Sequence, residues 1–338
     1  MEINVYAVDL PLRHTFKIAH DQRDVQQSVI VELTDGNFKG YGEATANPYY
    51  GVSRESIIEA VNSLKTPLAD VEIASTDDFY NKISGLIGNK SFPLCALDEA
   101  AHDLLGKKKG MPTYKMWGLE AINMPMSNYT IGIDTVDKML SKMQEVPWPL
   151  YKIKLGTSED IEIIKTLRKH TDAIFRVDAN CAWSVEETIE NARVMKTLGV
   201  EFIEQPMKAD NWEGMKEAMK HSALPLIADE SCIVEEDVEK CIGHFHGINI
   251  KLTKCGGLTV ARRMIEKARA NQMKVMVGCM TESTVGISAI AQLLPLLDYV
   301  DMDGAMLLKE DPAIGVQLVN GHVQFATENG NGVNLKNS

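Results

Sequence analysis

The sequence predicts an α/β protein in which an eight-stranded parallel barrel follows a smaller α+β unit. From about Tyr129, short apolar runs alternate with amphipathic segments of helical period, which is the pattern of βα units. These apolar runs number eight, and that number favours a closed barrel over an open sheet. The absence of a G-x-G-x-x-G motif also disfavours an open dinucleotide-binding sheet.

Residues 1–122 form the predicted α+β unit, which opens with antiparallel strands. Asp35-Gly36 is a hairpin signal between two of them. Ser53 is a predicted N-cap, because apolar residues follow it at helical spacing. The expected elements are strands at Asn4–Leu10, Ser28–Leu33 and 40–44, a helix after Ser53, and a helix over about Leu94–Leu105.

The barrel is expected over residues 123–311. Ser184 and Glu187 form a predicted capping box for the helix after the third strand. The remaining segment, 312–338, has hairpin character around Asn320-Gly321, and we expect it to return to the first unit. The predicted barrel strands are Tyr129–Ile133, Tyr151–Leu155, Ile174–Ala179, Val200–Gln205, Leu224–Ala228, Ile248–Leu252, Val275–Val277 and Tyr299–Met302.

Composition limits the possible partners and location. The chain of 338 residues has 45% hydrophobic and 24% charged residues, so it is not disordered as a whole. A net charge of −12 argues against nucleic acid or an anionic membrane surface as a partner. We expect neither a signal peptide nor a membrane span. The six cysteines are scattered without a C-x-x-C pair, so reduced thiols and a cytoplasmic protein are predicted.

Charged residues recur where the predicted strands end. In a parallel barrel these positions converge on one mouth. A single charged residue at a strand end is usually only exposed to solvent. Five in succession, 22 to 26 residues apart, favour a functional site. Lys152 also points to this site, because it precedes one of the five by two residues on the same strand. The five are Lys154, Asp178, Glu204, Asp229 and Lys251.

The chemistry of these residues is consistent with metal-assisted proton transfer. The carboxylates of Asp178, Glu204 and Asp229 are hard oxygen ligands, which suit Mg²⁺ better than zinc. A bound Mg²⁺ can hold a substrate carboxylate and stabilise the charge that develops when the neighbouring carbon loses a proton. Lys154 and Lys251 would flank that carbon, one removing the proton and the other returning one. A lysine acts as a base only when its pKa falls toward the working pH, and a nearby metal ion has this effect.

The strand-end motifs resemble those of the enolase superfamily, in its muconate-lactonizing subgroup, over essentially the whole chain. The motifs are Y-K-I-K-L-G, V-D-A-N, I-E-Q-P, A-D-E-S and N-I-K-L-x-K-x-G-G. The resemblance implies a capping domain, built from both chain ends, over a modified (β/α)7β barrel. It also implies one Mg²⁺ per subunit on the three carboxylates, Lys154 and Lys251 as the acid/base pair, and Lys152 on the substrate carboxylate. Barrels of this superfamily are commonly homo-oligomers, so a homo-oligomer is expected.

The eighth strand indicates the activity within the subgroup. Asp301-Met302-Asp303-Gly304 resembles the D-x-D motif with which dipeptide epimerases hold the α-ammonium of the substrate. Two carboxylates suit a buried ammonium and would repel an anionic muconate or succinylbenzoate. Thr130 resembles a threonine that contacts substrate. The implied reaction is 1,1-proton transfer through an enediolate at the C-terminal residue of a dipeptide. L-Ala-D/L-Glu and related dipeptides from peptidoglycan turnover are the expected substrates.

Specificity is expected from a mobile loop of the capping domain, Phe16 to Asp24. Arg23 is its only arginine and is the candidate partner for an acidic side chain. His20, Asp21 and Asp24 are further candidates in the same loop.

Three more residues near the strand ends receive other roles. Lys254 is expected to be structural or on the surface, because its strand parity is opposite to that of Lys251. Glu230 is expected to orient a metal ligand, and Cys279 to line the cavity. Two alternatives stay open: an N-acylamino acid racemase, o-succinylbenzoate synthase or other cycloisomerase, and a non-catalytic barrel that binds a metal or small acid.

Overall fold

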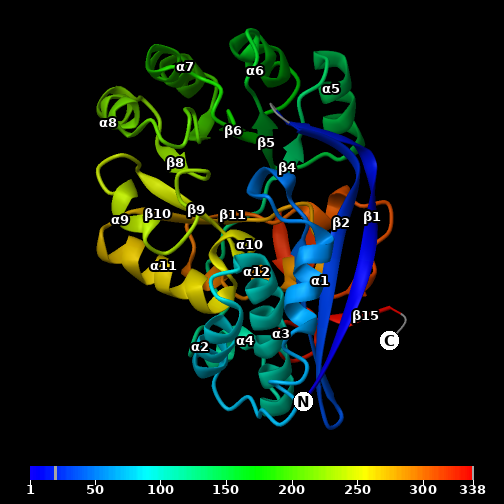
Figure 1. The fold of residues 1–338 in the computed structure, drawn as a ribbon. Coiled ribbons are helices and arrows are strands. Elements are labelled where there is room, and N and C mark those ends of the chain that lie inside the picture. The colour runs from blue at the N-terminus through cyan, green and yellow to red at the C-terminus, as the bar shows by residue number, and fades with distance from the viewer. Residues whose placement is uncertain (19–20, 337–338) are drawn as a thin grey trace.

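The computed structural model describes residues 1–18 and 21–336, and it consists of a barrel and a cap (Figure 1). His20, one of the predicted specificity candidates, lies outside the described residues. No helix within the described ranges is long and apolar enough to cross a membrane.

The cap begins with an antiparallel meander of β1 (Glu2–Ile18), β2 (Asp21–Asp35) and β3 (Phe38–Thr45). The predicted Asp35-Gly36 turn is confirmed: Gly36 has φ 59°, and Asp35 pairs with Phe38. Both β1 and β2 run far beyond the predicted strands and form a projecting hairpin.

The prediction of a loop over Phe16 to Asp24 is therefore wrong for the described residues. Phe16 pairs with Arg23 near the end of the hairpin, after a register shift that begins at Pro11. Most side chains of this part are exposed or half-buried, and the hairpin rests on only a small apolar cluster of Leu10, Leu12 and Leu308, against which Phe16 packs. Apolar alternation could not indicate such strands, because it arises from burial of one face.

Four helices complete the cap: α1 (Arg54–Asn62), α2 (Thr76–Ile87), α3 (Ser91–Lys109) and α4 (Thr113–Met116). The predicted Ser53 cap is confirmed, since its side chain accepts a hydrogen bond from the Ser56 amide. α3 packs closely on the sheet, where a Cβ at Gly42 would come within 2.0 Å of the Ala96 carbonyl oxygen. The short η1 (Pro48–Tyr50) follows β3 and faces the barrel mouth.

All eight predicted barrel strands are confirmed in position, and the capping box of Ser184 and Glu187 is present. The strands pair in sequence order, and a bridge between Ser127 and Val300 joins the first strand region to the last. After β11 comes a short 3-10 helix, η3, so the barrel is (β/α)7β. In order, the elements are β4 (Tyr129–Ile131), α5 (Val136–Glu145), β5 (Leu150–Lys154), α6 (Asp160–Arg168), β6 (Ile174–Asp178), α7 (Val185–Thr197), β7 (Val200–Glu204), α8 (Trp212–His221), β8 (Leu226–Ala228), α9 (Asp237–Cys241), β9 (Gly247–Lys251), α10 (Leu252–Cys255), α11 (Leu258–Ala270), β10 (Lys274–Gly278), α12 (Thr284–Ala291), η2 (Leu294–Leu296), β11 (Tyr299–Asp301) and η3 (Gly304–Leu307).

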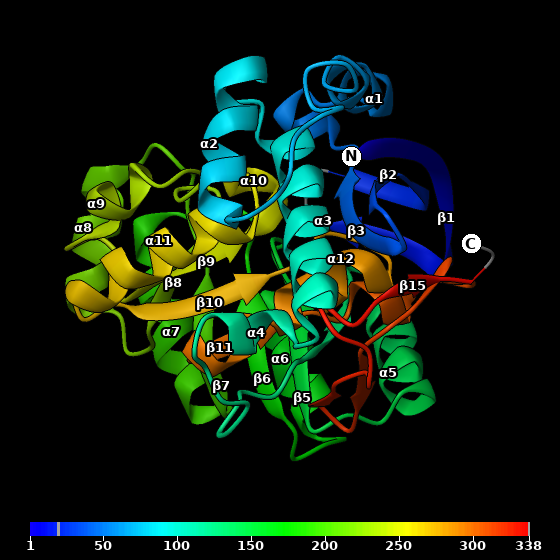
Figure 2. The same cartoon turned by 90° about the horizontal axis from the view of Figure 1, so that it is seen from below.

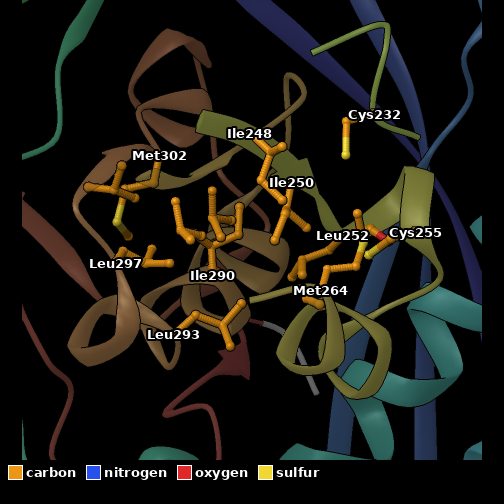
Figure 3. Close-up of a cluster of buried hydrophobic side chains, with 14 of the residues drawn as sticks. Cys232, Ile248, Ile250, Leu252, Cys255, Met264, Ile290, Leu293, Leu297 and Met302 are labelled. Carbon is orange, nitrogen blue, oxygen red and sulfur yellow. The ribbon is translucent and has the colours of Figure 1, made fainter. Parts of the chain in front are cut away.

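The main core extends from the cap sheet and helices into the space between the barrel strands and their surrounding helices. Figure 3 shows Ile248 and Ile250 of β9 among Met264 of α11 and Ile290 of α12, and all four are fully or almost fully buried. Because successive side chains of a strand point to opposite faces, this packing turns Asn249 and Lys251 toward the inside of the barrel.

The C-terminal segment touches both parts of the molecule. β12 (Ala313–Ile314) pairs with β15 (Asn334–Leu335), and the Asn331 amide donates to Asp103 Oδ1 of α3 at 2.7 Å. The hairpin of β13 (Gln317–Val319) and β14 (His322–Gln324) turns at Asn320-Gly321, as predicted, and Gly321 accepts a hydrogen bond from the Ser127 amide before β4. Figure 2 shows α3 of the cap beside α12 of the barrel.

Candidate active site

A cavity of about 340 Å³ lies at the carboxyl ends of the barrel strands, beneath the cap. Arg23 and Tyr50 belong to its cap side. Cys279 forms part of the wall, as expected from the sequence. Six of the predicted site residues line it from the barrel: Thr130, Lys152, Lys154, Lys251, Asp301 and Asp303.

The three predicted metal ligands come together beneath the lysines that line this cavity. Asp178 ends β6, Glu204 ends β7, and Asp229 directly follows β8, so parallel pairing places them side by side. One carboxylate oxygen from each lies within 4.8 Å of the others, and each residue is at most 1% exposed. Three buried carboxylates at this separation fit a hard divalent cation such as Mg²⁺.

Three lysines contact the carboxylate triad formed by Asp178, Glu204 and Asp229. Lys152 Nζ lies 2.7 Å from Glu204 Oε2, 2.8 Å from Asp301 Oδ2 and 3.2 Å from Asp178 Oδ2. Lys154 Nζ lies 2.7 Å from Asp178 Oδ2, and Lys251 Nζ lies 2.7 Å from Asp229 Oδ2. The two predicted acid/base lysines therefore hold opposite ends of the triad.

Burial and neighbouring charges shift the titration of these groups. Burial and the charge of Asp178 raise the pKa of Glu204 to about 7. Burial opposes ionisation of Asp229, but Lys251 and the other nearby lysines outweigh it and lower its pKa. Burial would lower the pKa of Lys251, yet Asp229 raises it well above the ordinary value. The protein charges alone thus keep Lys251 protonated, and a cation on Asp229 would oppose this effect.

Lys254 does not lie on the surface, and its contacts fit the other role expected for it, a structural one. Its buried ammonium donates to Asp229 Oδ1 and to the Asp229 carbonyl oxygen, both at 2.6 Å. Strand parity does not apply to it, since the chain leaves β9 at Lys251 and turns into α10. The buried Lys254 bonds to Oδ1 of Asp229, while Lys251 bonds to Oδ2.

Two further polar residues position the predicted ligands and were missed. Asn249 donates through Nδ2 to Glu204 Oε1 at 2.8 Å, and Gln205 Oε1 accepts from the Asp229 amide at 2.9 Å. The signal for Asn249 was its position two residues before Lys251, as the polar residue on the barrel-facing side of an apolar strand.

The two aspartates of the D-x-D motif have different surroundings. Asp301 bonds to Lys152 and accepts from Asn128 Nδ2 at 2.7 Å; despite burial, Lys152 lowers its pKa to about 2. Asp303 accepts from the Thr130 amide at 2.5 Å and from its hydroxyl at 3.3 Å. Burial and the charge of Asp301 raise the pKa of Asp303 to about 8. Thr130 therefore holds Asp303 in place at the edge of the cavity.

The cap hairpin lies over the first barrel strand. The Ile133 amide donates to the Lys17 carbonyl oxygen at 3.1 Å. Arg23 is half-buried and bonds to Gln26, while the Thr15 hydroxyl donates to Asp24 at 2.5 Å. Arg23, one of the predicted loop candidates, thus lies in the cavity wall.

An eight-stranded barrel that carries three adjacent carboxylates between lysines is typical of metal-assisted acid/base enzymes. Residues 135–338 match the family model described as enolase C-terminal domain-like, and residues 1–118 match the mandelate racemase / muconate lactonizing enzyme N-terminal domain. The chain therefore belongs to the enolase superfamily.

Named relatives match nearly the whole chain. It is 57% identical to an L-Ala-D/L-amino acid epimerase of Flavobacterium johnsoniae, over 99% of this chain and 100% of the relative. It is 37% identical to an L-Ala-D/L-Glu epimerase of Bacteroides thetaiotaomicron, over 98% and 88%. Among solved structures, a dipeptide epimerase of Cytophaga hutchinsonii complexed with Mg and D-Ala-L-Val superposes with a TM-score of 0.93 at 25% identity, covering 99% of this chain and 96% of that one.

Proposed function

We propose that this chain is a Mg²⁺-dependent dipeptide epimerase that inverts the α-carbon of the C-terminal residue by 1,1-proton transfer. The observation that carries the proposal is the arrangement of Lys154 and Lys251 at opposite ends of the carboxylate triad, within one cavity that also contains Asp303. The relatives named as epimerases, at up to 57% identity, support the same activity.

Asp178, Glu204 and Asp229 are the proposed Mg²⁺ ligands. Their shared burial and short mutual distances support this assignment. When bound, the ion would neutralise the charge that develops on the substrate carboxylate after loss of the α-proton.

Lys154 and Lys251 are the proposed acid and base. Each ammonium is anchored by one carboxylate and lines the cavity, so each can be directed at one face of the substrate α-carbon. One lysine removes the proton and the other delivers a proton to the opposite face, which inverts the configuration. Lys152 is almost completely buried and balances the charge of the carboxylates, in addition to its proposed contact with the substrate carboxylate.

Asp301 and Asp303 are the proposed receptor for the substrate α-ammonium. Asp301 already neutralises Lys152, so Asp303 supplies most of the new interaction, with Thr130 setting its orientation. A free ammonium at Asp303 would favour the charged carboxylate. An N-acyl substrate lacks this charge, which separates the proposed activity from that of an N-acylamino acid racemase.

L-Ala-D/L-Glu and related dipeptides from peptidoglycan turnover are the proposed substrates. Arg23 in the cavity wall is the proposed contact for an acidic C-terminal side chain. A cytoplasmic location is supported by six free thiols, which are typical of a reducing compartment. Assembly into a homo-oligomer stays a prediction from the superfamily, and light scattering after size exclusion would test it.

Chiral analysis of dipeptides incubated with the enzyme tests the proposed activity. We expect L-Ala-L-Glu to give L-Ala-D-Glu with Mg²⁺, and no conversion with excess chelator. A panel with aliphatic, aromatic and basic C-terminal residues would define the preference. Failure to convert any member, together with turnover of N-succinyl amino acids, would replace the proposal by the racemase alternative.

A further inference from the structure

Asn180 and Glu230 form a polar pair that spans the end of β7. Asn180 follows β6 and Glu230 follows β8, the two strands that flank β7 in the barrel. Asn180 Nδ2 donates to Glu230 Oε1 at 3.3 Å, and both residues line the cavity. In the strand order, β7 lies across the barrel from β11, which carries Asp301. The pair therefore borders the triad on the side away from the proposed ammonium receptor.

Each member of this pair has one acceptor oxygen that no group of residues 1–18 or 21–336 uses. Asn180 Oδ1 and Glu230 Oε2 are hidden from solvent and have no hydrogen-bond partner among the described residues. Asn180 and Glu230 are only 6% and 7% exposed. Buried polar atoms are nearly always bonded, so two adjacent ones without a partner point to a ligand that donates hydrogen bonds.

The backbone also holds the pair in place. Asn180 has φ 43°, a left-handed conformation that few residues other than glycine adopt, although asparagine tolerates it. Its amide donates to Asp178 Oδ1 at 3.0 Å, which ties the strained residue to a proposed metal ligand. Strain of this kind is retained mainly where function requires a particular geometry.

The neighbouring groups identify the kind of donor. Asp178 and Asp229, which lie within two residues of the pair, are carboxylates and offer no proton at neutral pH. The nearby ammonium groups of Lys251 and Lys254 already donate to the Asp229 carboxylate. The proposed position of the substrate ammonium is across the barrel. A divalent cation held by three carboxylates keeps further coordination positions, and water usually fills those that substrate leaves open. Water bound to such a cation is a strong hydrogen-bond donor.

We propose that Asn180 and Glu230 accept hydrogen bonds from the water ligands of the bound divalent cation and are positioning residues for it. This inference rests on the proposed metal site of Asp178, Glu204 and Asp229. It adds that the water ligands would lie on the side of the ion that faces the ends of β6 and β8. Groups that hold metal ligands in this way typically change metal affinity by about 10- to 100-fold.

Mn²⁺ binding to the full chain without dipeptide tests the assignment independently of turnover. Free Mn²⁺ is measured by electron paramagnetic resonance, and bound water by the relaxation rate of the water protons. We expect Glu230→Ala to weaken Mn²⁺ binding about 10- to 100-fold and to change the relaxation of bound water. Glu230→Gln keeps one acceptor oxygen and should lose less.

Glu282→Gln is the matched control, because Glu282 is a comparably buried carboxyl that follows β10 rather than β6 or β8. We expect its Mn²⁺ affinity to stay within about twofold of wild type, since no metal-bound water would contact it. Wild-type affinity and relaxation in Glu230→Ala would overturn the inference, as would an equal loss in the control. If Glu230→Ala is unfolded by circular dichroism, Glu230→Gln decides by the same two measurements. Unchanged binding in Asp178→Asn would instead refute the proposed metal site itself.

Discussion

Lys152→Met tests the charge balance on which the site depends. Lys152 is 1% exposed, and its ammonium lies within 3.2 Å of three buried carboxylates, from Asp178, Glu204 and Asp301. Removing one partner of a buried ion pair costs about 3–5 kcal/mol, because the remaining charge is left uncompensated. Methionine keeps most of the apolar stem, so the loss of charge dominates.

The expected change in melting temperature follows from the size of the chain. The unfolding entropy of 338 residues is about 0.7 kcal/mol/K, so the apparent Tm should fall by about 4–7 °C in the presence of a chelator. Mg²⁺ would supply positive charge to Asp178 and Glu204, which leaves Asp301 as the unpaired group. The difference from wild type should then shrink to about 1–3 kcal/mol, or about 1–4 °C.

Scanning calorimetry with chelator and with saturating Mg²⁺ measures both differences. Lys165→Met is the control, since the Lys165 side chain is 43% exposed and pairs with Glu162 on the surface of α6. Its Tm should change by less than about 1 °C under both conditions. A decrease in the Tm of Lys152→Met that is equally large with and without Mg²⁺ would refute the reasoning, because the ion would then not replace the lysine charge.

Three other predictions concern the substrate. The double substitution Asp301→Asn and Asp303→Asn should lower kcat/KM for dipeptides by about 10²–10⁴-fold, because two charge-assisted hydrogen bonds to the substrate ammonium are lost. An equal decrease in kcat/KM for an N-acyl substrate would contradict the proposed ammonium receptor. The pKa of Asp303 of about 8 predicts that kcat/KM rises with pH as this carboxyl ionises, and then falls as the substrate ammonium, with a pKa of about 8, loses its proton. The rising limb of the pH profile should disappear in Asp303→Asn. A profile of this variant identical to that of wild type would contradict the role of Asp303. Arg23→Gln should lower kcat/KM for L-Ala-L-Glu by about tenfold and leave L-Ala-L-Val unchanged; equal losses would show that Arg23 is not the side-chain contact.

Sequence spacing predicted the barrel and its cluster of charged strand ends because both depend on one rule. In a parallel barrel, each strand end meets its neighbours, so a residue such as Asp178 at one strand end must lie near Glu204 at the next. The inward direction of Lys152 followed equally from the period of two along a strand. No detail of packing was needed for these residues.

Residues beyond the strand ends were harder to predict. The burial of Lys254 against Asp229 did not follow from strand parity, because Lys254 lies in a short helix, where Gly256 and Gly257 with positive φ set the path of the chain. The long hairpin of the cap was missed because its exposed side chains lack the alternation of a buried strand. The pairing of Asn180 with Glu230 joins two loops 50 residues apart, a contact that no local pattern encodes.

Deuterium exchange during turnover tests the central claim most directly. L-Ala-L-Glu is incubated in D₂O with Mg²⁺ and wild type, Lys154→Ala or Lys251→Ala, and both α-protons are followed by NMR. The account predicts that wild type introduces deuterium at the C-terminal α-carbon alone, and that each folded lysine variant stops epimerisation. Absence of exchange in wild type with every dipeptide of a broad panel, or undiminished epimerisation in both variants, would contradict it.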